Sequence, residues 1–78
     1  IKSQAEYKKG VEISKKYSFK HTLAEGLIEL GEAYFLSEEQ DLALTCFNEG
    51  LSTAQEIGFA EYIEKGKSQL EKYFSKKR

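Results

Sequence analysis

Large and small apolar residues stand at fixed offsets along residues 24–57, and this spacing most constrains what the chain can fold into. The set contains two leucines, two aromatic residues and three small residues: Leu27, Leu30, Gly31, Tyr34, Ala43, Phe47 and Gly50. They fall on two segments, each with the three- and four-residue spacing of an amphipathic helix. A hairpin of two short amphipathic helices cannot bury all of its apolar surface alone. The pattern therefore predicts an all-α fold in which helix hairpins stack.

The chain also aligns with itself when it is shifted by about 40 residues, a length typical of structural repeats. Four identical pairs and four conservative pairs result: Gly10/Gly50, Phe19/Phe59, Gly26/Gly66, Leu30/Leu70, Tyr7/Phe47, Val11/Leu51, Leu23/Ile63 and Tyr34/Phe74. These pairs agree with the helical periodicity, so we infer that the chain contains an internal repeat.

Helical periodicity predicts four helices. The first, second and fourth are expected over residues 2–17, 19–36 and 59–74. The third is expected to begin at a Ser37–Gln40 capping box and to end at Gly58. Gly58 suits the left-handed residue that ends a helix. The inward faces are expected to carry Tyr7, Gly10, Val11 and Ser14; Leu23, Leu27, Leu30 and Tyr34; Leu44, Phe47, Leu51 and Ala54; and Ile63, Leu70 and Phe74.

Five glycines lie inside the helical patterns, where each costs about 1 kcal/mol relative to alanine. They are Gly10, Gly26, Gly31, Gly50 and Gly66. Functional flexibility is one interpretation of these glycines. We favour close helix packing, with Tyr34 and Phe47 filling the notches that the glycines leave.

The spacing resembles the tetratricopeptide repeat, whose consensus has Trp or Leu, Leu-Gly, Tyr, Ala, Phe and Ala at these offsets. Gly50 replaces the last alanine, and Gln55 stands where the consensus has proline. The resemblance implies an antiparallel helix-hairpin array, a fragment of an α-solenoid with about four helices. The period of about 40 residues exceeds the usual 34. It is similar to that of the cytoplasmic peptide-pheromone receptors of Gram-positive bacteria, which include aspartate-phosphatase regulators and related transcription factors.

The phase of the repeat predicts how the chain, a single domain of residues 1–78, is divided. The first helix aligns with the third and the fourth with the second, so one full repeat over residues 20–57 is flanked by two half repeats. We expect the chain to be an excised or processed piece of a longer array. Unpartnered terminal helices would leave Tyr7, Val11, Ile63 and Phe74 uncovered, which predicts a homo-oligomer formed through them.

Composition excludes several classes of function. Twelve Lys and Arg residues against thirteen Asp and Glu residues give a net charge of -1, which disfavours nucleic acid as a partner. No apolar run is long enough to span a bilayer, and no signal peptide is recognisable. A single cysteine, Cys46, rules out an internal disulfide and predicts a reducing, cytoplasmic location. We expect Cys46 to be a packing residue.

The resemblance implies that the first helix of each repeat lines a concave groove. On this phase the groove carries Glu25, Ile28, Glu29, Glu32 and Phe35 from the second helix, and Lys65, Ser68, Gln69 and Lys72 from the fourth. Glu25 aligns with Lys65, and Glu32 with Lys72. These charges either bind a partner of mixed charge, pair with each other, or form a solvated face.

Related domains that bind a carboxy-terminal carboxylate use Lys and Asn where this chain has Ile28, Glu29 and Glu32, so that ligand is disfavoured. The only histidine, His21, has no nucleophile or metal ligand near it in sequence and is expected at the surface or the groove edge. No phosphate loop, zinc spacing or catalytic triad is present. We therefore expect neither an enzyme nor a cofactor or metal site.

The predicted function is binding of a protein or peptide segment, as the ligand-sensing or regulatory part of a bacterial cytoplasmic regulator. The alternative is a structural or oligomerisation scaffold without a peptide ligand. Regulation of an enzyme by sequestration is a third interpretation.

Overall fold

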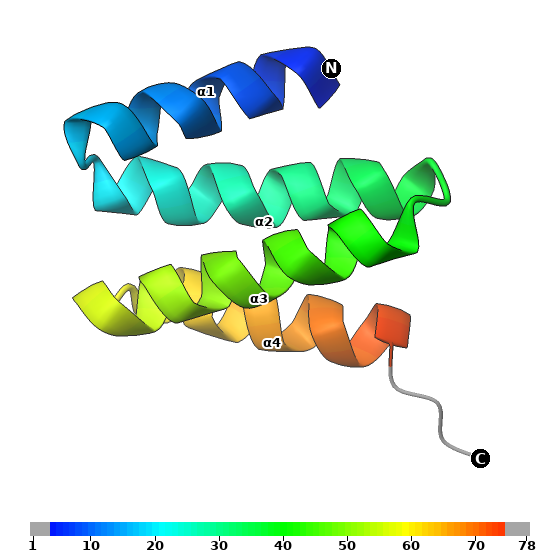
Figure 1. Cartoon of the computed structure of the whole chain (residues 1–78). Helices are drawn as coiled ribbons and strands as arrows, with labels where there is room; N and C mark the ends of the chain where they lie inside the picture. The colour runs from blue at the N-terminus through cyan, green and yellow to red at the C-terminus, as the bar shows by residue number, and fades with distance from the viewer. Residues whose placement is uncertain (1–3, 75–78) are drawn as a thin grey trace.

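The computed structural model describes residues 4–74, which form four helices and no strands (Figure 1). The helices are α1 (Gln4–Tyr17), α2 (Lys20–Leu36), α3 (Gln40–Ile57) and α4 (Ala60–Phe74). The fold is all-α, as predicted, and the helix bounds lie within a few residues of those expected from periodicity. The expected start of the first helix at residue 2 lies outside the described residues.

Helix α2 is the centre of the structure, because it contacts α1, α3 and α4. Successive helices run antiparallel, and α1, α2 and α3 lie side by side while α4 packs behind α3 (Figure 1). This arrangement is compatible with an array of helix hairpins. Within residues 4–74, every helix falls short of the length and apolarity that crossing a bilayer requires.

Three turns of the same kind connect the helices. Each has a residue in the left-handed region, namely Ser18 (φ 59°), Glu38 (φ 65°) and Gly58 (φ 69°). The next residue in each turn donates its backbone N–H to a carbonyl five residues earlier, as Phe59 does to Ala54 at 2.8 Å. This is the Schellman hydrogen-bond pattern. The prediction that Gly58 ends a helix is confirmed, while the first two turns place a side chain where glycine is preferred.

Glu38→Gly is therefore expected to raise the free energy of unfolding by a few tenths of a kcal/mol up to about 1 kcal/mol, since left-handed backbone is strained for residues with a Cβ. Chemical denaturation measures the change. Gly58→Ala is the matched opposite, which should destabilise the chain because it creates the same strain at φ 69°. Equal stability of all three proteins would contradict the argument.

The predicted Ser37–Gln40 capping box is wrong. Ser37 ends α2, where its backbone N–H donates to Ala33 and Tyr34, and Glu39 precedes α3 without a side-chain capping bond. The Ser37 hydroxyl instead accepts a hydrogen bond from Gln4 Nε2 at 3.0 Å. Because the turn is short, Ser37 lies at the end of α2 rather than at the start of α3. Its side chain therefore links α1 to this turn and does not cap α3.

The core lies where α2 meets its neighbours. Its buried members are Val11, Leu23, Leu27, Ile28, Leu30, Tyr34, Ala43, Cys46 and Phe47. Cys46 is a free, buried thiol, as expected of a packing residue. Leu44 was expected to face inward but is 39% exposed, because Ala43 and Phe47 are the α3 residues turned toward α2.

Glycine notches bring the helices close together, as predicted for Gly31. A Cβ at Gly31 would lie 2.9 Å from two ring carbons of Phe47. Ile28, rather than Tyr34, fills the notches at Gly50 and Gly66, where its Cδ1 would lie 2.8 and 3.2 Å from an added Cβ. The inward position predicted for Gly10 is wrong, since this residue is exposed and a Cβ there would contact nothing within 4 Å.

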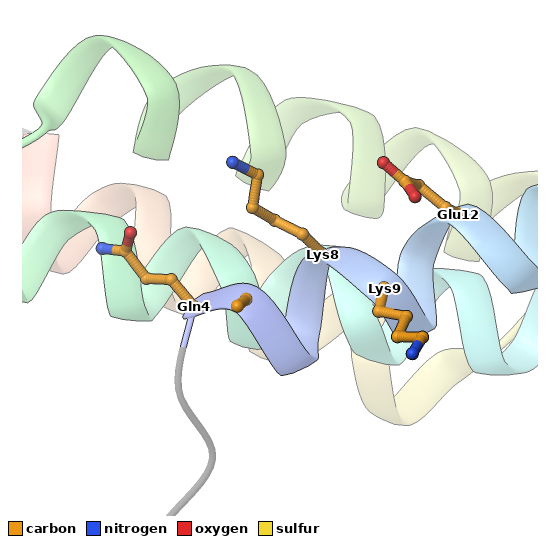
Figure 2. Close-up of a pocket in the computed structure, with 5 residues that line it drawn as sticks. Gln4, Lys8, Lys9 and Glu12 are labelled. Carbon is orange, nitrogen blue, oxygen red and sulfur yellow. The ribbon is translucent and has the colours of Figure 1, made fainter.

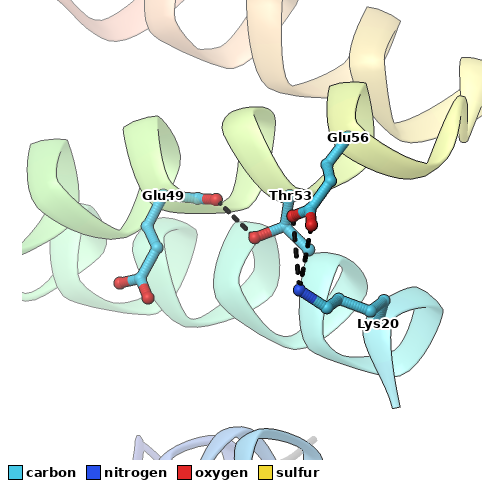
Figure 3. Close-up of polar contacts among 4 residues, drawn as sticks. All are labelled: Lys20, Glu49, Thr53 and Glu56. Carbon is cyan, nitrogen blue, oxygen red and sulfur yellow. Dashed lines mark hydrogen bonds and ion pairs between the residues drawn. The ribbon is translucent and has the colours of Figure 1, made fainter. Parts of the chain in front are cut away.

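Polar contacts on the surface join α3 to its neighbours. Lys20 at the start of α2 pairs with Glu56 near the end of α3 at 3.2 Å; within α3 itself, the buried Thr53 hydroxyl donates to the Glu49 carbonyl at 2.9 Å (Figure 3). Lys15 of α1 pairs with Glu49 at 3.1 Å. Exposed pairs of this kind contribute about 0–1 kcal/mol each, so apolar packing carries most of the stability.

The terminal helices are better covered than the sequence indicated. Val11 is 6% exposed because it packs against Gly26 of α2, and Tyr7, Ile63 and Phe74 are half-buried. Other large apolar side chains are exposed instead: Ile13, Tyr17, Phe19, Leu36, Leu42 and Leu44.

Candidate functional site

The candidate site is the surface where α2 and α4 lie against each other, on the side away from α3. We define the α2–α4 face by its half-buried or exposed side chains: Glu25, Glu29, Glu32, Phe35, Tyr62, Lys65, Gln69, Lys72 and Tyr73. Helical spacing of three and four residues places the α2 members along one edge and the α4 members along the other.

Three glutamates form an acidic row along α2. Glu25, Glu29 and Glu32 are all half-buried, and Glu32 Oε2 accepts a hydrogen bond from Gln69 Nε2 at 3.2 Å. The other two carboxylates form no hydrogen bond or ion pair with residues 4–74. The row therefore keeps two carboxylates available to cations of a partner.

The lysines of α4 lie over tyrosine rings. Lys65 Nζ lies 5.3 Å from the ring centroid of Tyr62, and Lys72 Nζ lies 5.5 Å from that of Tyr73. No ion pair joins Lys65 to Glu25 or Lys72 to Glu32, so the internal pairing considered from the sequence is absent among the described residues. Cation–π contacts at exposed sites contribute about 0.5–1 kcal/mol, which is enough to orient a lysine.

Aromatic side chains stand at both ends of the acidic row. Phe35 stacks on Tyr73 with ring centroids 4.0 Å apart, and it meets Phe74 edge-on at 5.5 Å. At the other end Phe59 lies 4.7 Å from the exposed His21 ring and 4.9 Å from that of Tyr62. Each cluster offers a flat apolar surface beside charged groups, an arrangement typical of peptide-binding surfaces.

Both tyrosines of this face have raised pKa values. Burial raises the pKa of Tyr62, and the nearby carboxylates of Glu25, Glu29 and Glu61 raise it further. Burial and the Glu32 carboxylate do the same for the pKa of Tyr73. Both hydroxyls are thus neutral hydrogen-bond donors at the rim of the acidic row.

An alkaline titration tests this electrostatic arrangement. Tyr62 is expected to ionise above the usual pKa of about 10, and Glu29→Gln should lower that pKa because it removes a negative charge. The difference in tyrosinate absorbance between the chain and its Tyr62→Phe variant isolates this residue. Since the unfolded chain ionises first, stability should fall as pH rises from about 10 toward the folded-state pKa. Glu71→Gln is the control, and an identical shift in it would contradict the proximity argument.

The structure places seven of the nine predicted groove residues on the α2–α4 face, with Ser68 exposed beside them on α4. Ile28 is the exception: it is 0% exposed, because its side chain lies between Gly50 of α3 and Gly66 of α4. A partner therefore has no access to it, and its prediction as a groove residue is wrong. Tyr62 and Tyr73 were missed, although they stand three residues before Lys65 and four residues after Gln69, which is the spacing of a shared helix face.

A depression lies between α1 and α3, on the side of α2 opposite the α2–α4 face. Its volume is about 230 Å³, and Val11, Leu27, Leu30, Tyr34 and Leu42 contribute apolar surface to it. Lys8 and Glu12 also line it and extend from α1 toward α3. They are seen in Figure 2, which shows a neighbouring pocket on α1 where Lys9 points away from α3. The Lys15–Glu49 ion pair crosses this depression. Burial and the Glu49 carboxylate raise the pKa of the Cys46 thiol at its wall, which keeps the thiol protonated and unreactive.

No protein-family model, no curated protein and no solved structure matches this chain. The assignment of a function therefore depends on the geometry of the α2–α4 face.

Proposed function

We propose that the chain is a helical-repeat module of the tetratricopeptide type that binds a protein or peptide segment along the α2–α4 face. In this proposal it is the ligand-sensing or regulatory part of a bacterial cytoplasmic regulator. The observation that supports it most directly is an acidic row with an aromatic cluster at each end.

The charges of this face define the chemistry of the segment. Glu25 and Glu29 form no ion pair with residues 4–74, while Lys65 and Lys72 are held over tyrosine rings. A segment with Lys or Arg in its middle would pair with the carboxylates, and apolar residues at its ends would pack on the aromatic clusters. Such complementarity selects a partner more than it adds affinity.

The length of the row favours a short segment. Glu25 and Glu29, the two carboxylates available to a partner, are four residues apart on one helix, which is about 6 Å at 1.5 Å per residue. An extended chain covers that distance with about two residues. We therefore expect a ligand whose two basic residues lie two or three positions apart and are followed by an aromatic or branched aliphatic residue.

Isothermal titration calorimetry tests the proposal with a basic-apolar peptide and an acidic peptide of the same apolar content. Only the basic peptide is expected to bind, and Glu29→Lys should weaken it by about tenfold or more. Lys72→Glu should also change affinity, because it frees the ring of Tyr73 and reverses a charge.

Glu64→Lys is the matched control, since Glu64 is exposed on α4 and lies outside the α2–α4 face. Circular dichroism should show unchanged helicity in all three variants. Equal affinity of the parent chain and both face variants would place the binding surface elsewhere. Absence of binding to either peptide would favour the alternative, a scaffold without a peptide ligand.

A further inference from the structure

Helix α1 has less support from the rest of the fold than the other described helices. It packs on α2 alone, whereas α2, α3 and α4 each contact at least two helices. Its buried residues are Val11 and Ser14, against seven on α2 and six on α3. Val11 fills the notch at Gly26, where an added Cβ would lie 3.1 Å from its Cγ2. A segment with so few buried apolar contacts separates at a lower free energy than the whole fold.

Helix α1 reaches α3 and the turn before it through exposed polar side chains. Near the end of α1, Lys15 Nζ pairs with Glu49 Oε2 at 3.1 Å, and both side chains are about half exposed. Near its start, Gln4 Nε2 donates to Ser37 Oγ at 3.0 Å and to Glu39 Oε2 at 3.3 Å. Water and salt compete with contacts of this kind, so each holds α1 only weakly.

The depression between α1 and α3 lies between these two bridges. Val11 and Lys15 line it from α1, and Leu27 and Leu30 line it from α2. Cys46 of α3 lies at its wall and is 9% exposed. Movement of α1 away from α2 would therefore uncover two buried leucines and the thiol.

The link between α1 and α2 is short and strained. Tyr17 ends α1, Lys20 begins α2, and Ser18 between them has φ 59°. Left-handed backbone is unfavourable for a residue with a Cβ, and a few residues between helices are enough to absorb a hinge movement. Helix α1 has 14 residues, a length at which an isolated helix is marginal in water. Separation from α2 would therefore also unwind α1.

The remaining three helices have a core that does not include α1. The Phe47 ring packs on Gly31 of α2 and lies 5.9 and 6.1 Å from the rings of Tyr73 and Phe74 on α4. Helix α2 also places Ile28 between Gly50 of α3 and Gly66 of α4. These contacts persist when α1 moves.

We propose that α1 is a hinged flap, which opens at Ser18 while α2, α3 and α4 stay folded, and which controls access to Cys46, Leu27 and Leu30. The Lys15–Glu49 pair and the Gln4 hydrogen bonds hold the flap closed. Salt favours the open state, because it screens the ion pair. The flap lies on the side of α2 opposite the α2–α4 face, so its opening requires no bound peptide.

Chemical labelling of Cys46 in the 78-residue chain tests the proposal, because this is the single cysteine. The rate of reaction with an excess of a water-soluble aromatic disulfide is measured at several urea concentrations below the unfolding transition. Opening of α1 exposes much less surface than global unfolding, so the rate should depend only weakly on urea. It should also exceed, by about tenfold or more, the rate that global unfolding allows.

Two substitutions separate opening of α1 from loss of stability elsewhere. Val11→Ala empties the Gly26 notch and should raise the labelling rate about tenfold. Leu70→Ala is the matched control, because Leu70 packs against the core from α4, which does not contact α1. It should lower the urea midpoint of unfolding and leave the labelling rate without urea unchanged.

Hydrogen exchange of the α1 amides tests the ion pair. Labelling is unsuitable here, since the pKa of the Cys46 thiol depends on burial, on Glu49 and on Lys15. Lys15→Gln should speed exchange in α1 by about two- to fivefold. Lys8→Gln is the control, because Lys8 also lines the depression but forms no ion pair within residues 4–74, and it should leave exchange unchanged.

Labelling with the urea dependence of global unfolding would overturn the proposal, since α1 would then not open by itself. This measurement needs no variant. Equal rates in the chain and in Val11→Ala would also overturn it, because the thiol would then react through the depression with α1 in place. So would an equal acceleration by Val11→Ala and Leu70→Ala.

Discussion

Phe47→Ala is expected to lower the free energy of unfolding by about 3–5 kcal/mol, the usual cost of replacing a buried aromatic ring by a methyl group. Phe47 is 0% exposed. Its ring contacts Gly31 of α2 and lies 5.9 and 6.1 Å from the rings of Tyr73 and Phe74 on α4. Its removal therefore opens a cavity between three helices at once.

A loss of this size is a large part of the stability of a small domain. Urea denaturation followed by circular dichroism measures it, and the variant should be partly unfolded even without denaturant. Phe19→Ala is the matched control, because Phe19 is 54% exposed and stacks on the exposed ring of Tyr17. A Phe47→Ala variant as stable as the Phe19→Ala variant would show that Phe47 is not the centre of the core.

Gly31→Ala and Gly10→Ala are expected to change stability in opposite directions. At Gly31 the new methyl group would lie 2.9 Å from the Phe47 ring and 3.2 Å from the Ala43 carbonyl oxygen. Neither neighbour is a flexible chain end, so α2 and α3 must separate. Overpacking costs about 1–3 kcal/mol, which exceeds or offsets the gain of about 1 kcal/mol from replacing a helical glycine.

At Gly10 no steric clash opposes the gain in helix propensity, so the free energy of unfolding should rise by up to about 1 kcal/mol. Thermal and urea melts at low micromolar concentration compare the two variants, since dilution removes any contribution from self-association. A stabilising effect of both substitutions would show that α2 and α3 are less closely packed at Gly31 than described. A destabilising effect of both would show that Gly10 is covered within the monomer.

The sequence by itself determined the helices and the position of the first hairpin. Apolar residues at three- and four-residue spacing, such as Leu27, Leu30 and Tyr34, define which side of a helix is buried, since this depends only on helical geometry. Gly58 ended α3 where expected, because the left-handed backbone there favours glycine. The role of Phe47 was also predictable, since a large ring and a small Gly31 fit together at these offsets.

Only the tertiary structure decided which of several equivalent apolar residues is covered. The sequence placed Ile28 in a groove, and the structure buries it because α4 crosses α2 close enough for Gly66 to receive its side chain. Periodicity describes one helix at a time, whereas this contact depends on the angle and separation of three helices.

The chemistry of the candidate site was likewise decided in three dimensions. Sequence alignment paired Lys65 with Glu25, but a lysine side chain takes the nearest favourable partner, and in the folded chain that partner is the Tyr62 ring on its own helix. For the same reason the sequence presented Gly10 and Gly50 as equals. A Cβ at Gly50 would meet Leu27 and Ile28 of α2, whereas a Cβ at Gly10 would meet nothing within 4 Å, so of the two only Gly50 faces a neighbouring helix within residues 4–74.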